Sequence, residues 1–265
     1  MTALGVSADE LIVAGCGTVV PEGDRAASAY WVSMDRARVL FDCGPGAVQA
    51  LARLGLPWGG LTDLVISHFH ADHVGALPGL LFAFRHGLER PRARPLTISG
   101  PSGTRRFLER LADAYGDFVL DPGFPLRIEE VAPGKPRALD GGPLLEAHST
   151  PHTEESVAWR LDGAASSFGY SGDTGPSTEL GPFMRGVGAL VCECSLDDAD
   201  AADNHLSPGR VAALASAARP RLLVLTHMYP HFRMRCDVAC LVAEAGYPGD
   251  ACLAREGLRV TLTNG

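Results

Sequence analysis

The segment Leu64–Gly75 constrains this chain more than any other, because an apolar run is followed directly by a cluster of imidazoles and a carboxylate. The run Leu64–Ile66 predicts a buried strand. Three histidines and one aspartate then fall within residues 68–73, in the order His-Phe-His-Ala-Asp-His. Imidazole and carboxylate groups suit zinc and similar divalent ions. A solvated polar loop is the alternative, and the density of ligand-type side chains argues against it.

The geometry expected for these residues indicates two metal ions. His68 and His70 are two positions apart, so their side chains point the same way in an extended segment. Asp72 and His73 follow after a turn and cannot share that direction. Two pairs of ligands aimed differently predict two divalent ions side by side, with coordination positions left open for water or substrate.

Three further polar residues lie just beyond predicted strands, where active-site groups of α/β proteins commonly gather: His152, Asp173 and His227. His148 lies four positions before His152, inside the predicted strand, and competes with it for the same role. Asp173 is assigned as the bridge, because a carboxylate can offer one oxygen to each ion. The expected ligands are His68, His70 and His152 for metal one, and Asp72, His73 and His227 for metal two.

Strand-like and helix-like runs occur in both halves of the chain, which suits two sheets covered by helices. A hairpin of Ala29–Ser33 and Ala37–Phe41 ends at Asp42, which either orients a ligand histidine or is an ordinary turn residue. Other strands are expected at Leu11–Thr18, Leu96–Ser99, Leu144–Thr150, Val157–Leu161, Ser167–Ser171, Val187–Cys194, Arg221–Thr226 and Leu258–Leu262. Helices are expected at Ala47–Leu54, Ala76–His86, Thr104–Tyr115, Pro208–Ala218 and Arg235–Ala245. No linker or repeat interrupts the pattern, so residues 1–265 are expected to form one domain.

The pattern His-x-His-x-Asp-His resembles the signature of the metallo-β-lactamase superfamily. The resemblance implies an α/β (α+β) chain folded as a four-layer αββα sandwich, with a metal site at one edge of the two sheets. Further stretches resemble ribonuclease Z and its close relatives rather than the antibiotic-hydrolysing branch. These stretches are Leu40–Gly46, Ile66–Pro78, Ser99–Gly103, Ser171–Thr174 and Leu225–His227.

The resemblance to the ribonuclease Z branch also implies roles for individual histidines. In that branch the ligand after the bridging aspartate is a histidine near the C-terminus, and an earlier histidine assists catalysis. His227 and His205 match these two positions. The segment from His152 to Arg160 looks like the ligand-bearing loop and following strand of the family, which favours His152 over His148.

One departure from ribonuclease Z bears on the substrate. True ribonuclease Z carries a long arm that grips tRNA, inserted between the fourth histidine and the bridging aspartate. Here only two short predicted strands and a turn separate His152 from Asp173, so no arm fits. The net charge of −8 also argues against a general basic footprint for nucleic acid. The chain therefore resembles the armless relatives, which include small-molecule phosphodiesterases.

We expect a hydrolase that uses two divalent ions, Zn²⁺ by ligand type with Mn²⁺ or Fe as alternatives, to cleave a small or nucleotide-like phosphodiester through a bridging hydroxide. Asp72 is expected to help deprotonate the water, and a protonated His205 to assist the developing oxyanion or the leaving group. The expected ligands suit several reactions. Lactone, thioester or sulfate-ester hydrolysis and ribonuclease Z-type RNA cleavage therefore remain alternatives.

The rest of the sequence indicates a cytoplasmic protein with no membrane partner. It has no signal-peptide pattern and no apolar stretch that approaches a membrane span. Its seven cysteines are scattered without a Cys-x-x-Cys pair, which indicates free thiols in a reducing compartment. The resemblance implies a homodimer, although no stretch identifies an interface.

Overall fold

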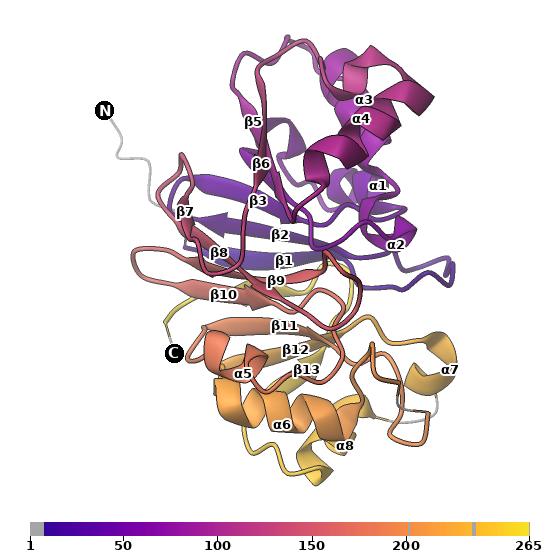
Figure 1. Ribbon diagram of the computed structural model, residues 1–265, viewed down its shortest axis with the longest axis vertical. Helices are drawn as coiled ribbons and strands as arrows, with labels where there is room; N and C mark the ends of the chain where they lie inside the picture. The colour runs from indigo at the N-terminus through magenta and orange to yellow at the C-terminus, as the bar shows by residue number, and fades with distance from the viewer. Residues whose placement is uncertain (1–7, 201, 235–236, 265) are drawn as a thin grey trace.

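The computed structural model describes residues 8–200, 202–234 and 237–264. Two seven-stranded sheets lie face to face, and helices cover the outer face of each, as Figure 1 shows. This is the predicted four-layer αββα arrangement. The first sheet has the order β14 (Arg259–Thr261), β1 (Glu10–Gly15), β2 (Ala29–Met34), β3 (Ala37–Phe41), β4 (Asp63–Val65), β5 (Leu96–Gly100) and β6 (Leu126–Glu130).

The second sheet is built almost entirely from the C-terminal half of the chain. Its order is β13 (Ala251–Leu253), β12 (Leu222–Thr226), β11 (Ala189–Glu193), β10 (Ser167–Tyr170), β9 (Val157–Asp162), β8 (Leu144–Ser149) and β7 (Arg137–Ala138). The last strand of the chain, β14, returns to the first sheet and pairs with β1, with Leu11 opposite Val260. Both ends of the described chain are thus fixed in the same sheet.

Three apolar clusters hold the layers together. One lies between the sheets and includes the buried rings of Tyr30, Trp159 and Tyr170. The second packs the first sheet against the helices α1 (Ala47–Arg53), α3 (Leu77–His86) and α4 (Thr104–Tyr115). The third packs the second sheet against α5 (Leu180–Phe183), α6 (Pro208–Ala218) and α8 (Val238–Glu244). Strands with apolar side chains on both faces are expected where a sheet is covered on both sides.

Parallel strands bring their carboxyl ends to one edge of the sandwich. β3 to β6 run parallel in the first sheet, and β10 to β13 run parallel in the second. The loops after β3, β4, β10, β11 and β12 therefore emerge at the same edge, together with the loop between β8 and β9. Ligands of open α/β sheets bind outside the carboxyl ends of the strands, so this edge is where a site is expected.

The structure differs from the predicted elements in several places. The observed helix α8 is shorter than the predicted helix Arg235–Ala245. It begins at Val238, because the side chain of Asp237 caps its N-terminus. Residues 235–236 lie outside the described residues. Strand β13 and the short helices α2 (Ala71–Val74), α5 and α7 (Pro230–Arg233) were not predicted, since segments of three or four residues carry too little periodicity. Within the described chain, no helix has both the length and the apolarity needed to cross a bilayer.

Candidate metal centre

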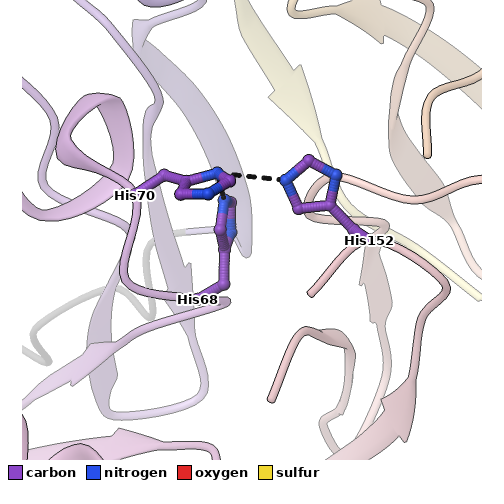
Figure 2. A group of neighbouring side chains, drawn as sticks. All are labelled: His68, His70 and His152. Atoms are coloured by element: carbon purple, nitrogen blue, oxygen red, sulfur yellow. Dashed lines mark hydrogen bonds between the residues drawn. The ribbon is translucent and has the colours of Figure 1, made fainter. Parts of the chain in front are cut away.

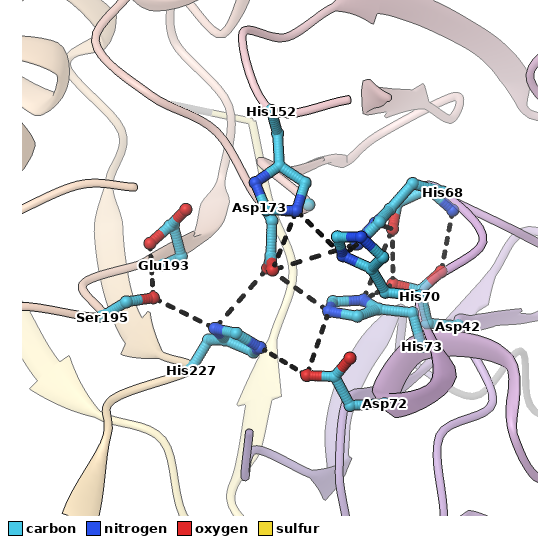
Figure 3. Close-up of polar contacts among 12 residues, drawn as sticks. Asp42, His68, His70, Asp72, His73, His152, Asp173, Glu193, Ser195 and His227 are labelled. Atoms are coloured by element: carbon cyan, nitrogen blue, oxygen red, sulfur yellow. Dashed lines mark hydrogen bonds and ion pairs between the residues drawn. The ribbon is translucent and has the colours of Figure 1, made fainter. Parts of the chain in front are cut away.

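The seven predicted ligands lie together at the edge just described, in loops that follow strands (Figure 3). The loop after β4 and the start of α2 carry His68, His70, Asp72 and His73. The segments after β8, β10 and β12 carry the other three. The fold thereby brings side chains separated by as many as 155 positions within hydrogen-bonding distance.

The first trio consists of His68, His70 and His152, as Figure 2 shows. Nδ1 of His70 lies 3.0 Å from Nε2 of His68 and 3.1 Å from Nε2 of His152. His68 is buried and His70 is exposed, so the trio reaches from the interior to the surface. Three imidazole nitrogens this close together, from two separate loops, have the arrangement of ligands around one ion.

The second trio consists of Asp72, His73 and His227, and its ligand atoms all lie within 4.8 Å of one another. Oδ2 of Asp72 lies 3.2 Å from Nε2 of His227 and 4.0 Å from Nε2 of His73. The two trios contain the residues predicted as ligands of metals one and two.

Asp173 lies between the two trios and faces each with a different oxygen. Its Oδ2 is 4.0 Å from Nε2 of His68 and 3.7 Å from Nε2 of His152. Its Oδ1 is 3.3 Å from Nε2 of His73 and 3.6 Å from Nδ1 of His227. A carboxylate in this position can give one oxygen to each of two cations.

Two polar atoms at the centre lack the partners that burial requires. Among the described residues, Nε2 of His73 and Oδ1 of Asp173 are buried and have no hydrogen-bond partner. Buried polar atoms nearly always have a hydrogen-bond partner, and a buried polar atom without one lowers the free energy of unfolding. Both atoms point toward the space shared by the trios, so a bound cation would satisfy them. The residues present therefore fit a binuclear metal site.

Asp42 orients the ring of His73 through Nδ1, the nitrogen that does not face Asp173. Its buried carboxylate accepts from Nδ1 of His73 at 2.7 Å, from the hydroxyl of Tyr170 at 2.6 Å, and from the backbone N–H and hydroxyl of Ser67 at 2.8 and 2.7 Å. A metal-ligating histidine commonly donates its other nitrogen to a carboxylate in this way. Of the two interpretations of Asp42, the structure supports the orienting role.

Three other ligand histidines are also held through their Nδ1 atoms. These contacts are His68 Nδ1 with the Ser67 hydroxyl at 3.0 Å, His152 Nδ1 with the Asn204 carbonyl at 2.9 Å, and His227 Nδ1 with the Ser195 hydroxyl at 3.0 Å. Such contacts fix the ring orientation before any ion binds, which reduces the entropy lost on binding.

The backbone is strained at two of these positions. Asp42 has a φ of 56° and His227 a φ of 55°, the left-handed region that non-glycine residues rarely adopt. Both residues directly follow a strand, β3 and β12 respectively. Strain of this kind persists where the surrounding structure demands it and is concentrated at functional sites.

Four of the ligands have the protonation state that binds a cation. Burial lowers the pKa of His68 and of His152, so both rings are neutral near pH 7. Burial alone would raise the pKa of Asp173, but the charges of His227 and His73 hold it well below its usual range. The pKa of Asp72 is likewise lowered, against its burial, by the hydrogen bond with His227. Both carboxyl groups are therefore ionised. For His73, burial would lower the pKa, but the charges of Asp173 and Asp42 raise it well above its ordinary value.

His205 lies beside the trios and is paired with a carboxylate that the sequence analysis did not single out. Its ring lies 4.9 Å from that of His152 and 5.9 Å from that of His227. Its Nδ1 is 2.9 Å from Oε1 of Glu193. Burial would lower the pKa of His205, but the hydrogen bond and charge of Glu193 raise it above its ordinary value.

Glu193 was missed because it sits in an apolar strand-like run between Cys192 and Cys194, with no histidine or aspartate beside it. It is the last residue of β11, which lies between β10 and β12. Asp173 and His227 follow those two strands. The position of Glu193 at the end of the strand between them could therefore have identified it as a residue of the site.

His148 lies away from the trios. It stacks on Phe183 with ring centroids 5.0 Å apart, and its Nε2 is 3.8 Å from a carboxylate oxygen of Glu179. It belongs to none of the groups of side chains that fit a metal ion in the described chain. The preference for His152 over His148 therefore agrees with the geometry.

The chain is similar to proteins of known family. Residues 37–228 match the family described as the beta-lactamase superfamily domain. A ribonuclease Z of the archaeon Halorubrum lacusprofundi is 39% identical over 148 residues, which cover 56% of this chain and 46% of that protein. The uncharacterized protein Rv1339 of Mycobacterium tuberculosis is 33% identical over 257 residues, 94% of this chain and 92% of that protein.

Solved structures share the fold. YhfI of Bacillus subtilis, a metallo-β-lactamase fold protein, superposes with a TM-score of 0.81 at 22% identity, covering 98% of this chain and 100% of that one. The short form of human tRNase Z superposes with a TM-score of 0.77 at 24% identity, covering 96% and 99%. With the family match and the His/Asp centre, these likenesses show that the chain belongs to the metallo-β-lactamase superfamily, close to ribonuclease Z and Rv1339, and is a metal-dependent hydrolase of that fold.

Proposed function

We propose that this protein is a binuclear metal-dependent phosphodiesterase acting on a small or nucleotide-like phosphodiester. The observation that carries the proposal is the position of Asp173, with one oxygen toward each histidine-containing trio. When bound there, two metal ions would polarise the phosphoryl oxygens and make hydroxide available near neutral pH. By ligand type we propose zinc, with manganese or iron as alternatives.

The side chains around the ions have separate tasks in this proposal. The first trio, the second trio and Asp173 would hold the two ions. Asp72, which is ionised, accepts a proton from the attacking water. The contacts of Asp42 and Ser67 fix the ligand rings, so little reorganisation accompanies the reaction.

His205 supplies the proton that the leaving group needs. Glu193 raises the pKa of His205, so the imidazole stays charged to higher pH than that of an ordinary histidine. The hydrogen bond occupies Nδ1, which leaves Nε2 as the proton donor. A positioned general acid typically contributes ~10²–10⁴-fold to the rate.

RNA cleavage is the second candidate, because the relatives include proteins named ribonuclease Z. The segment between His152 and Asp173 consists of β9, a tight turn and β10, so it holds no inserted arm. We therefore favour a small substrate over tRNA.

A cytoplasmic location is part of the proposal. Among the described residues, Cys16, Cys43 and Cys192 are buried and form no disulfide, and neither do Cys240 and Cys252. Cys236 lies outside the described residues. Unpaired thiols are typical of reducing compartments.

The test combines metal analysis with a panel of esters. We expect about two equivalents of metal per chain in the purified protein and hydrolysis of bis-p-nitrophenyl phosphate in preference to lactone, thioester and sulfate-ester substrates. Asp173→Asn is the matched variant and should lose activity together with one or both equivalents of metal. Faster turnover of a lactone or thioester than of any phosphodiester would contradict the proposal, as would salt-sensitive cleavage of tRNA alone.

A further inference from the structure

A pocket of about 490 Å³ opens beside the second trio, and its wall includes Asp72. The pocket lies between the loop that follows β1 and the start of α1, with Glu256 on the far side. Its volume falls within the range of ~300–1,000 Å³ that is typical of pockets for small ligands. Of the seven predicted ligands, only Asp72 lines this pocket, so a group attached to a phosphoryl centre at the metals would enter the pocket past the Asp72 side chain.

The walls of this pocket are mainly hydrocarbon. They are formed by Val19, Val20, Pro21, Ala26, Ala27 and Pro45. Val19 and Val20 are exposed to 60% and 39%, which is unusual for valine and leaves their side chains free to cover a ligand. A group with apolar faces would therefore gain by entering this space.

Three charged residues that line the pocket, Arg53, Glu256 and Glu22, are held in ion pairs. Arg53 forms an ion pair with Glu256, and Glu22 forms one with Arg233 of α7. The guanidinium of Arg25 donates to Sγ of Cys16 at 2.9 Å. The ion pairs offset the charges of Arg53 and Glu22, whereas Arg25 keeps its positive charge, so the pocket carries too little positive charge for a polyanionic strand.

Gln49 is the exception among the polar lining residues. It lies on α1, is exposed, and its side-chain amide has no hydrogen-bond partner within the described chain. An amide offers a donor and an acceptor in one plane, which matches the edge of a heterocyclic base. Apolar walls with one such amide suit a group with apolar faces and a polar edge.

We propose that this pocket binds the nucleobase of the substrate, with Gln49 hydrogen-bonded to the edge of the base. The assignment rests on the proposed phosphodiesterase function, since it names the organic group attached to the phosphorus. His205 does not line this pocket, and it borders the metal site through His152 and His227 instead. The base therefore occupies a part of the site separate from the proton donor.

The test compares AMP with ribose 5-phosphate, which share phosphate and sugar and differ only in the base. Dissociation constants are measured by calorimetry on the metal-loaded protein, so the result does not depend on turnover. We expect AMP to bind at least about tenfold more tightly. Gln49→Trp fills the pocket from an exposed position and should bring the ratio close to one, whereas Ala52→Trp, on the same helix but outside the pocket, should keep it.

Two further binding measurements test whether the group in the pocket is a nucleobase. Gln49→Leu removes only the amide and should weaken AMP binding without changing that of ribose 5-phosphate. Equal affinities of the wild type for the two ligands, or an unchanged ratio in Gln49→Trp, would overturn the assignment. Phenyl phosphate binding as tightly as AMP, with no effect of Gln49→Leu, would also overturn it in favour of a plain aryl group. Failure to hydrolyse bis-p-nitrophenyl phosphate would instead refute the phosphodiesterase proposal, whatever the AMP ratio.

Discussion

Replacing Asp42 by Asn tests whether the ligand histidines are oriented by the groups behind them. The Asp42 carboxylate is fully buried and accepts hydrogen bonds from Ser67, His73 and Tyr170. Asn tolerates the left-handed backbone at this position, where φ is 56°, so the substitution removes the charge without adding backbone strain.

The expected magnitude follows from the four contacts. An amide has one acceptor oxygen, so its NH₂ group must face either the Ser67 backbone N–H or the His73 and Tyr170 donors. In either orientation at least one hydrogen bond to a charged acceptor, ~1.5–3 kcal/mol, is lost and a buried donor is left unsatisfied at ~1–3 kcal/mol. A total of about 3 kcal/mol corresponds to a fall of roughly 6–12 °C in the Tm of the metal-free protein. Metal affinity should fall by ~10–100-fold because His73 is no longer held.

The assay is thermal unfolding of the metal-free protein, followed by zinc competition against a chromogenic chelator. Asp35→Asn is the matched control, because Asp35 also has a positive φ, 51°, but lies in the β2–β3 turn and touches no ligand. It should change neither Tm nor zinc affinity appreciably. An Asp42→Asn protein with unchanged zinc affinity would refute the argument that Asp42 orients His73.

Three other substitutions separate the roles within the site. Asp173→Asn should reduce bound metal from about two equivalents to one or none, measured by elemental analysis, and retention of both ions would show that no bridge exists. His205→Ala should keep its metal and lose ~10²–10⁴-fold in kcat, and unchanged turnover would rule out a role as proton donor. Glu193 raises the pKa of His205, so the charged imidazole persists to higher pH in the wild type. Glu193→Gln should therefore move the alkaline limb of the kcat–pH profile to lower pH and leave the acid limb in place, and a profile that does not shift would contradict this coupling.

The clustered ligands show how much of a site local sequence can predict. Four ligands lie within six consecutive residues: His68, His70, Asp72 and His73. The buried strand before them sets the directions of their side chains. Backbone geometry over six residues is enough to infer that they divide into two groups. The strong elements were predicted for the same reason: α4 and α3 lie within a residue of their expected bounds, because their apolar faces repeat over three turns.

Residues whose meaning depends on a distant neighbour were harder to interpret. Asp42 had two equal interpretations from sequence, and only the approach of His73 and Tyr170 separated them. Glu193 and Ser195 carried no local signal, although they hold His205 and His227. The pocket beside Asp72 is lined by α1 and by loops from both ends of the chain, so no single stretch of sequence predicts it.

The sequence by itself determined the fold family and the chemistry of the metal centre, because ligand type and spacing are properties of the covalent chain. Only the tertiary structure decided which oxygen of Asp173 faces which trio, which carboxylates orient the histidines, and where the pocket lies. Those features arise where parallel strands of two sheets end at a common edge, and the pairing of strands distant in sequence sets that edge.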